Sequence, residues 1–78
     1  MTAVSGFSNI TVDPLICGGR PVIIGTRMRV VDILDMLGGG ASESEILSDF
    51  PYVKAHDIRS CLAYAASLVD HPVVIAAE

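Results

Sequence analysis

Three arginines in a short glycine-containing segment are the residues of this sequence most suited to binding chemistry. The segment is CGGRPVIIGTRMRV, residues 17–30, and it holds Arg20, Arg27 and Arg29. Arginine side chains commonly contact phosphate, and glycines let a backbone approach phosphate closely. The segment therefore predicts a basic surface that contacts nucleic acid.

The charges are unevenly distributed along the chain, which supports such a surface. Residues 1–31 carry three bases and one acid, a net charge of +2, whereas residues 32–78 carry two bases and eight acids, a net charge of −6. A cationic surface on an acidic protein suits contact with phosphate. Alternatively, the arginines pair within the fold with Asp13, Asp32 or Asp35. Arg27 suits that structural role, and Arg20 and Arg29 are the better candidates for contact.

A second pair of basic residues, Lys54 and Arg59, lies at the start of a predicted helix. Together with the helix before it, this helix would form a helix-turn-helix pair, whose second helix can read DNA bases. Asp57 on the same helix and three acids on the preceding helix would repel phosphate. Local charge therefore favours a bundle used for packing over duplex binding, and Lys54 and Arg59 are the helical candidates for nucleic-acid contact.

Residues that catalyse reactions or bind metals are few and widely spaced. Cys17, Cys61, His56 and His71 lack the close cysteine spacing of structural zinc sites, and no local nucleophile–base motif is present. Cys61 lies beside the apolar stripe of a predicted helix, so we expect a core thiol. Cys17 precedes two glycines, so we expect it to pack in a turn. We therefore expect no enzyme activity, no metal site and no cofactor.

The first part of the chain predicts β-structure. Residues 1–8 are small and polar, and we expect them to be disordered. Residues 9–12 alternate polar and apolar side chains, and residues 21–24 are apolar and β-branched, so each predicts a short strand. Together, residues 9–29 are expected to form a β-ribbon.

The rest of the chain predicts three helices and a tail. Apolar residues recur at helical spacing in residues 30–37, 42–50 and 55–68. Gly38 suits the left-handed position after the first helix, and Ser42 with Glu45 forms a capping box for the second. The apolar stripe of the third helix consists of Ile58, Leu62, Ala65 and Leu68.

The fold class that follows is α+β. A short N-terminal β-ribbon leads into a three-helix bundle over residues 30–68, within a single domain of residues 9–68. Residues 69–78 are expected to form an extended tail, because Pro72 breaks any helix and a Val-Val-Ile run favours extended structure.

Two motifs in this sequence resemble a known family. The first is Pro-x-Ile-Cys-Gly-Gly-x-Pro-x-Ile-x-Gly-Thr-Arg, which runs from Pro14 to Arg27, and the second is Leu-x-Tyr-Ala, from Leu62 to Ala65. Over residues 9–68 the chain resembles the small bacterial proteins of the domain-of-unknown-function 433 family. The resemblance implies a homeodomain-like three-helix fold and an antitoxin that binds a PIN-like ribonuclease. Lys54 departs from the pattern, where the family usually has Thr.

The apolar composition predicts that the chain binds a partner. Hydrophobic residues make up 51% of the chain, more than so short a domain can bury alone, so we expect a permanent partner or a dimer, and of these a homodimer. The tail residues Val73, Val74 and Ile75 are expected to bind a partner, either within the dimer or by strand addition to another protein. No apolar run is long enough for a membrane span and no export signal is present, so we expect a cytoplasmic protein.

Together with the resemblance, these observations predict the antitoxin of a type II toxin–antitoxin pair. It would neutralise a co-encoded PIN-like ribonuclease toxin by covering it, and it would also bind its own operator DNA. The alternative is a stand-alone DNA-binding transcriptional regulator that uses the basic residues of the ribbon.

Overall fold

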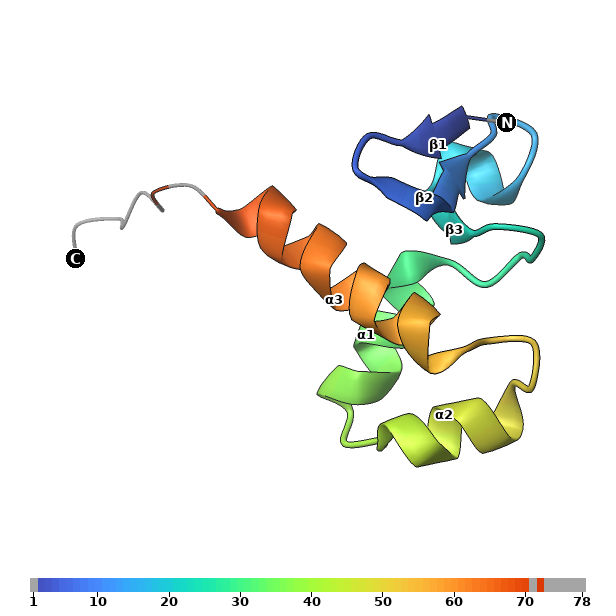
Figure 1. Ribbon diagram of the computed structural model, residues 1–78, viewed down its shortest axis with the longest axis vertical. Coiled ribbons are helices and arrows are strands. Elements are labelled where there is room, and N and C mark those ends of the chain that lie inside the picture. Colours follow the sequence, from blue (N-terminus) through green and yellow to red (C-terminus); the bar gives the residue numbers. More distant parts are fainter. Residues whose placement is uncertain (1, 71, 73–78) are drawn as a thin grey trace.

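The computed structural model describes residues 2–70 and residue 72 (Figure 1), and it shows a small sheet followed by three helices. In chain order the elements are β1 (Thr2–Val4), β2 (Phe7–Val12), the short 3-10 helix η1 (Cys17–Gly19), β3 (Val22–Ile23), α1 (Val30–Gly38), α2 (Glu43–Asp49) and α3 (Ala55–Val69). The predicted α+β class is confirmed.

The sheet has three antiparallel strands in the order β1-β2-β3. β2 forms its centre, where Ile10 pairs with Ile23 of β3, and both side chains are buried. Val22 forms a further bridge to Arg29, just before α1. The sheet is therefore joined directly to the start of the helical part.

The expectation that residues 1–8 are disordered was wrong for the residues the structure describes. Thr2–Val4 forms β1 and pairs with β2 across a two-residue turn at Ser5 and Gly6. Gly6 has a φ of +85°, a conformation that glycine adopts without steric penalty. The small residues in this segment form the tight turn of a β-hairpin.

α1 ends one residue later than predicted. Gly38 is still helical, and the residue with positive φ is Gly40, at +102°. The Gly40 N–H donates to the Leu37 carbonyl at 3.1 Å, and the Ala41 N–H donates to the Met36 carbonyl at 3.0 Å. These two bonds satisfy carbonyls that the end of α1 leaves free, and they fix the turn into α2.

α2 begins with the predicted capping box. The Glu45 N–H donates to Ser42 Oγ at 3.1 Å, and the Ser42 N–H donates to Glu45 Oε1 at 2.9 Å. The hydrogen bond from the Ser42 N–H, together with the Ser42 side chain, holds the pKa of the Glu45 carboxyl below its usual value. The box fixes the start of α2 through residues only three positions apart.

A single core lies between the sheet and the helices, and β2, β3 and all three helices contribute to it. Its buried members are Ile10, Ile23, Met28, Val30, Ile33, Ile46, Val53, Ile58 and Cys61. Cys61 is completely buried, which confirms the expected core thiol.

Candidate functional site

Helix α3 extends beyond the rest of the fold, and its C-terminal turns stand clear of the other elements (Figure 1). Its buried residues, Asp57, Ile58 and Cys61, all lie in the first half of the helix. Apolar residues continue the direction of Ile58 at helical spacing towards the C-terminal end. We name these residues the α3 stripe: Leu62, Ala65, Leu68 and Val69.

The α3 stripe is largely open to solvent. Leu62, Leu68 and Val69 are 46%, 58% and 69% exposed, so the described residues leave the C-terminal part of the predicted apolar stripe uncovered. Periodicity identifies the apolar side of a helix but does not say how far its neighbours extend. α3 has 15 residues and α1 has 9, so α1 cannot cover the full length of α3.

An apolar hollow of about 240 Å³ lies between α1 and the C-terminal half of α3, beside the α3 stripe. Behind it, the Tyr64 ring packs edge-on against Phe7 of β2, with ring centroids 5.5 Å apart. We name this hollow the α1–α3 groove; it is lined by Pro21, Val30, Val31, Leu34, Tyr64, Ala65 and Leu68. Its walls are almost entirely apolar, so it is suited to receive an apolar side chain.

Asp57 fixes α3 on the sheet. It is 7% exposed, and its carboxylate accepts hydrogen bonds from the Asn9 side-chain amide at 2.9 Å and from the Lys54 backbone N–H at 3.0 Å. A lysine side chain contains no hydrogen-bond acceptor atom, so Lys54 cannot cap the helix with its own side chain. Asp57 supplies the capping contact instead, by accepting from the Lys54 backbone N–H. The residue expected to repel phosphate therefore faces inward, which corrects that expectation.

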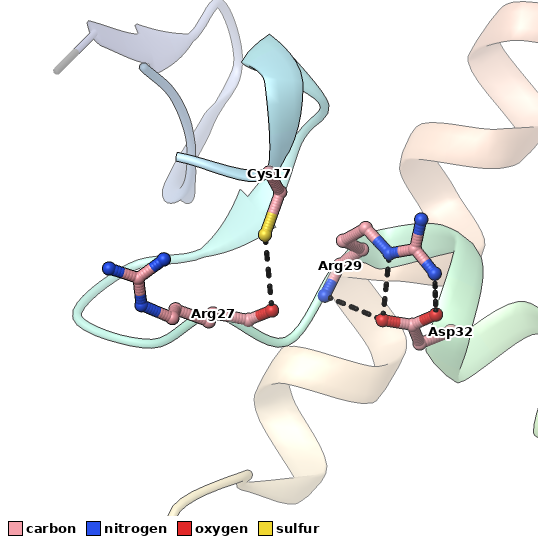
Figure 2. A network of polar contacts seen from close by, with 4 residues as sticks. All are labelled: Cys17, Arg27, Arg29 and Asp32. Carbon is pink, nitrogen blue, oxygen red and sulfur yellow. Dashed lines mark hydrogen bonds and ion pairs between the residues drawn. The ribbon is translucent and has the colours of Figure 1, made fainter. Parts of the chain in front are cut away.

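Among the arginines of residues 17–30, Arg29 is held within the fold (Figure 2). Its Nε and Nη2 atoms donate to the two carboxylate oxygens of Asp32 at 3.0 and 2.7 Å. This pairing lowers the pKa of the Asp32 carboxyl and raises that of the Arg29 guanidinium. The structural alternative included pairing with Asp32 but favoured Arg27 for it and Arg29 for contact, so the structure reverses the expected roles of these two arginines. Phosphate binding by Arg29 would have to compete with Asp32.

Arg27 and Arg20 are exposed instead. The Arg27 side chain points away from the ion pair, and its backbone carbonyl accepts a hydrogen bond from Cys17 Sγ at 3.5 Å (Figure 2). Cys17 has a φ of +51°, uncommon for a residue with a Cβ, and this contact helps to hold the glycine turn, as expected of a turn-packing residue. The Arg20 side chain lies close to Gly18: a Cβ atom placed on Gly18 would be 3.1 Å from Arg20 Nη1.

The two helical candidates, Lys54 and Arg59, are also exposed. Lys54 immediately precedes α3, and Arg59 lies on its outer surface about one turn later. The single ion pair formed among the described residues is that of Arg29 with Asp32, so the other four basic side chains have no acidic partner there. Those four remain candidates for nucleic-acid contact.

A second hollow, of about 370 Å³, lies beside the sheet and is lined by Thr11, Ile16, Val22, Gly25, Thr26 and Arg27. Thr26 is fully bonded, since its hydroxyl donates to the Ile23 carbonyl at 2.8 Å and accepts from the Met28 N–H at 3.0 Å. Thr11 is 2% exposed, and its hydroxyl has no partner among the described residues. Sequence reasoning missed Thr11, because a lone threonine in a strand carries no functional signal.

The described residues hold few groups with other chemistry. No three His, Cys, Asp or Glu side chains among them lie close enough together to hold a metal ion. Burial raises the pKa of the Cys61 thiol to about 11, so it stays protonated at neutral pH. None of the helices formed by these residues has the length and apolar character needed to cross a membrane.

Comparison with known proteins places the chain in a family. Residues 10–65 match the family described as "Protein of unknown function (DUF433)". The chain belongs to the DUF433 family. The crystal structure of a DUF433 member from Anabaena variabilis matches it with a TM-score of 0.73 at 29% identity, covering 76% of this chain and 58% of that one. The resemblance carried by the two motifs, and the fold, are thereby confirmed.

A curated relative extends the comparison. "Uncharacterized protein y4eO" of Sinorhizobium fredii is 38% identical over 56 residues, which are 72% of this chain and 25% of that protein. This chain thus spans about a quarter of that relative's length. The DUF433 match includes Asp57 and ends before Leu68 and Val69 of the α3 stripe. The predicted partner-binding residues Val73, Val74 and Ile75 lie outside the described residues.

Proposed function

We propose that this DUF433 chain is the antitoxin of a type II toxin–antitoxin pair, and that it binds and neutralises a co-encoded PIN-like ribonuclease. The observation that carries the proposal is the open apolar surface formed by the α3 stripe and the α1–α3 groove. An apolar helical surface of this kind is typical of protein-binding sites. A ribonuclease that acts on cellular RNA is a cytoplasmic partner, so we place the pair in the cytoplasm.

Binding through this surface would neutralise the nuclease by covering its active site. The residues of the stripe and groove include no Arg or Lys, so no cation would replace the metal ions of an acidic nuclease site. Full burial of a Val or Leu side chain is worth about 1.5–3 kcal/mol. Leu62, Leu68 and Val69 have much of their surface left to bury. Residues 73–75 follow α3 in sequence and would extend the same contact.

The test is the affinity for the co-encoded PIN-like nuclease, measured by calorimetry together with its ribonuclease activity. Leu68→Asp should weaken binding by at least about tenfold, because it places a charge in a desolvated contact. Leu68 is 58% exposed, so the fold should persist, which circular dichroism checks. Ser67→Asp, on the other side of the same turn, is the matched control and should bind normally. Normal affinity of Leu68→Asp would contradict the proposed surface.

A stand-alone DNA-binding regulator is the second candidate, and one observation favours it. Because Asp57 faces inward, it does not oppose the exposed Lys54 and Arg59 at the start of α3, and the acids that remain exposed nearby are those of α2. The loop that carries Arg27 lies on the same side of the molecule as the loop before α3 (Figure 1). Operator binding by the antitoxin itself would use the same residues.

Paired alanine substitutions separate the possible DNA contacts. Each lost phosphate contact should lower the slope of log K against log salt by about one. A lower slope in the double variant Lys54→Ala with Arg59→Ala would assign DNA binding to the helices. A lower slope in the double variant Arg20→Ala with Arg27→Ala would assign it to the ribbon. An unchanged slope in both double variants would exclude operator binding through these residues.

A further inference from the structure

The C-terminal half of α3 presents an apolar surface of the kind that one helix buries against another. Leu62, Ala65 and Val69 recur at spacings of three and four residues, the repeat by which paired helices interlock their side chains. The small Ala65 lies between larger residues, so a facing helix can approach closely there. The last turns of α3 extend beyond the other elements in Figure 1, so a second helix can lie along them.

The charged residues beside the α3 stripe can pair between two copies of the same helix, because one is basic and the other acidic. Arg59 and Asp70 are exposed and lie about three helical turns apart on the same flank of α3. Neither forms an ion pair among residues 2–70. If two α3 helices pack antiparallel with Ala65 against Ala65, Arg59 of each copy lies beside Asp70 of the other. Parallel packing would put the two charged flanks on opposite sides of the interface, so the charges favour the antiparallel arrangement.

We propose that the protein is an antiparallel homodimer joined through the α3 stripe. Leu62 of each copy then lies at the same level along the helix axis as Leu68 of the other, and an Arg59–Asp70 ion pair forms at each end. The interface has two-fold symmetry, so it closes at two copies and leaves no stripe free for a third. One consequence rests on the proposed function: the nuclease would use the same surface, so the homodimer and the nuclease complex exclude each other.

Sedimentation across the micromolar range tests the homodimer. The wild-type protein should sediment at about twice the 8.2 kDa mass of the chain. Leu68→Asp should raise the dimer dissociation constant by at least about tenfold, and Ser67→Asp, on the other side of the helix, should leave it unchanged. Circular dichroism on each variant checks that α3 remains helical. A wild-type protein that stays monomeric, or a dimer that withstands Leu68→Asp, overturns the proposal.

Charge reversal tests the orientation of the two helices. Arg59→Glu alone or Asp70→Arg alone places like charges at both ends of the interface, and each should weaken the dimer by roughly three- to tenfold. The double variant restores both complementary pairs and should recover the wild-type dissociation constant. If it does not recover, the antiparallel register is overturned.

Adding the co-encoded nuclease separates this inference from the proposed function. Replacement of the homodimer by a complex with one copy of each protein supports both. A homodimer that does not respond to nuclease supports the dimer and overturns the proposed function. Nuclease binding by a chain that is monomeric alone overturns the homodimer and leaves the proposed function standing. Nuclease bound to an intact homodimer overturns the shared surface.

Discussion

Asp57→Ala should destabilise the whole fold, because it removes the two hydrogen bonds that join α3 to the sheet and cap its start. Asp57 is 7% exposed, and its carboxylate accepts from the Asn9 amide at 2.9 Å and from the Lys54 N–H at 3.0 Å. No cation pairs with it among the described residues, so these two donors are what compensates its burial there.

The size of the effect follows from the two contacts. Loss of a capping hydrogen bond costs about 1 kcal/mol. The Asn9 amide, left half-buried without its partner, costs a further 1–3 kcal/mol or so. The free energy of unfolding should therefore fall by about 2–4 kcal/mol. In a domain of this size each kcal/mol shifts Tm by roughly 4–8 °C, so Tm should fall by roughly 8–32 °C.

Thermal and urea denaturation followed by circular dichroism measure this change. Asp35→Ala removes an exposed carboxylate and is the control, with an expected change below about 0.5 kcal/mol. Asn9→Ala and the double variant complete a mutant cycle, in which a coupling of about 0.5–3 kcal/mol is expected. If Asp57→Ala unfolds like Asp35→Ala, or if the two substitutions are additive, the carboxylate does not hold the helix and the reasoning is refuted.

Three further predictions concern single positions in the fold. Gly40→Ala should lower the free energy of unfolding by about 1 kcal/mol, because the φ of Gly40 is +102°. Gly38 is helical and has open space where a Cβ would lie, so Gly38→Ala should raise the free energy of unfolding by up to about 1 kcal/mol. Urea denaturation midpoints compare the two variants, and equal effects would contradict the assigned turn. Thr11→Val should be neutral or stabilising by up to about 1 kcal/mol, since the buried hydroxyl has no partner among the described residues, and a clear loss of stability would mean that it is bonded. The Cys61 thiol has its pKa raised to about 11 from 9.0, so only the unfolded thiol ionises as the pH rises; stability should fall between about pH 9 and 11, and Cys61→Ala should lack this fall. At pH 8 a thiol reagent should modify Cys17 before Cys61 in the folded protein and both residues in urea.

The helices could be predicted from the sequence because their signals act within a turn or two. The box from Ser42 to Glu45 and the apolar spacing located all three helices to within about a residue at each end. The hairpin of residues 2–8 was missed, because β1 is stabilised by pairing with β2 more than by its own side chains. The exposure of Leu62 and Leu68 could not be predicted, because spacing along α3 does not encode the length of α1.

The candidate site divides in the same way between local and distant contacts. Pairing of an arginine with Asp32 was foreseen as an alternative, but Arg27 was favoured for it; the partner is Arg29, which lies three positions from Asp32 at a helix start. The inward position of Asp57 was not foreseen, because its partner Asn9 lies 48 positions away along the chain. Which acid is exposed depends on such distant contacts, so sequence charge alone misjudged the surface at the start of α3.

The division of α3 into a buried half and an open half has a consequence for how such proteins diverge. Ile58 and Cys61 belong to the core, whereas Leu62, Leu68 and Val69 do not pack against it. Substitution of these three residues therefore costs the core little, while under the proposed function it would change what the helix binds. After gene duplication, a copy can acquire a new partner through two or three replacements and still fold. Under the proposed function, two duplicated proteins in one cell can in this way bind different partners while they keep the same fold.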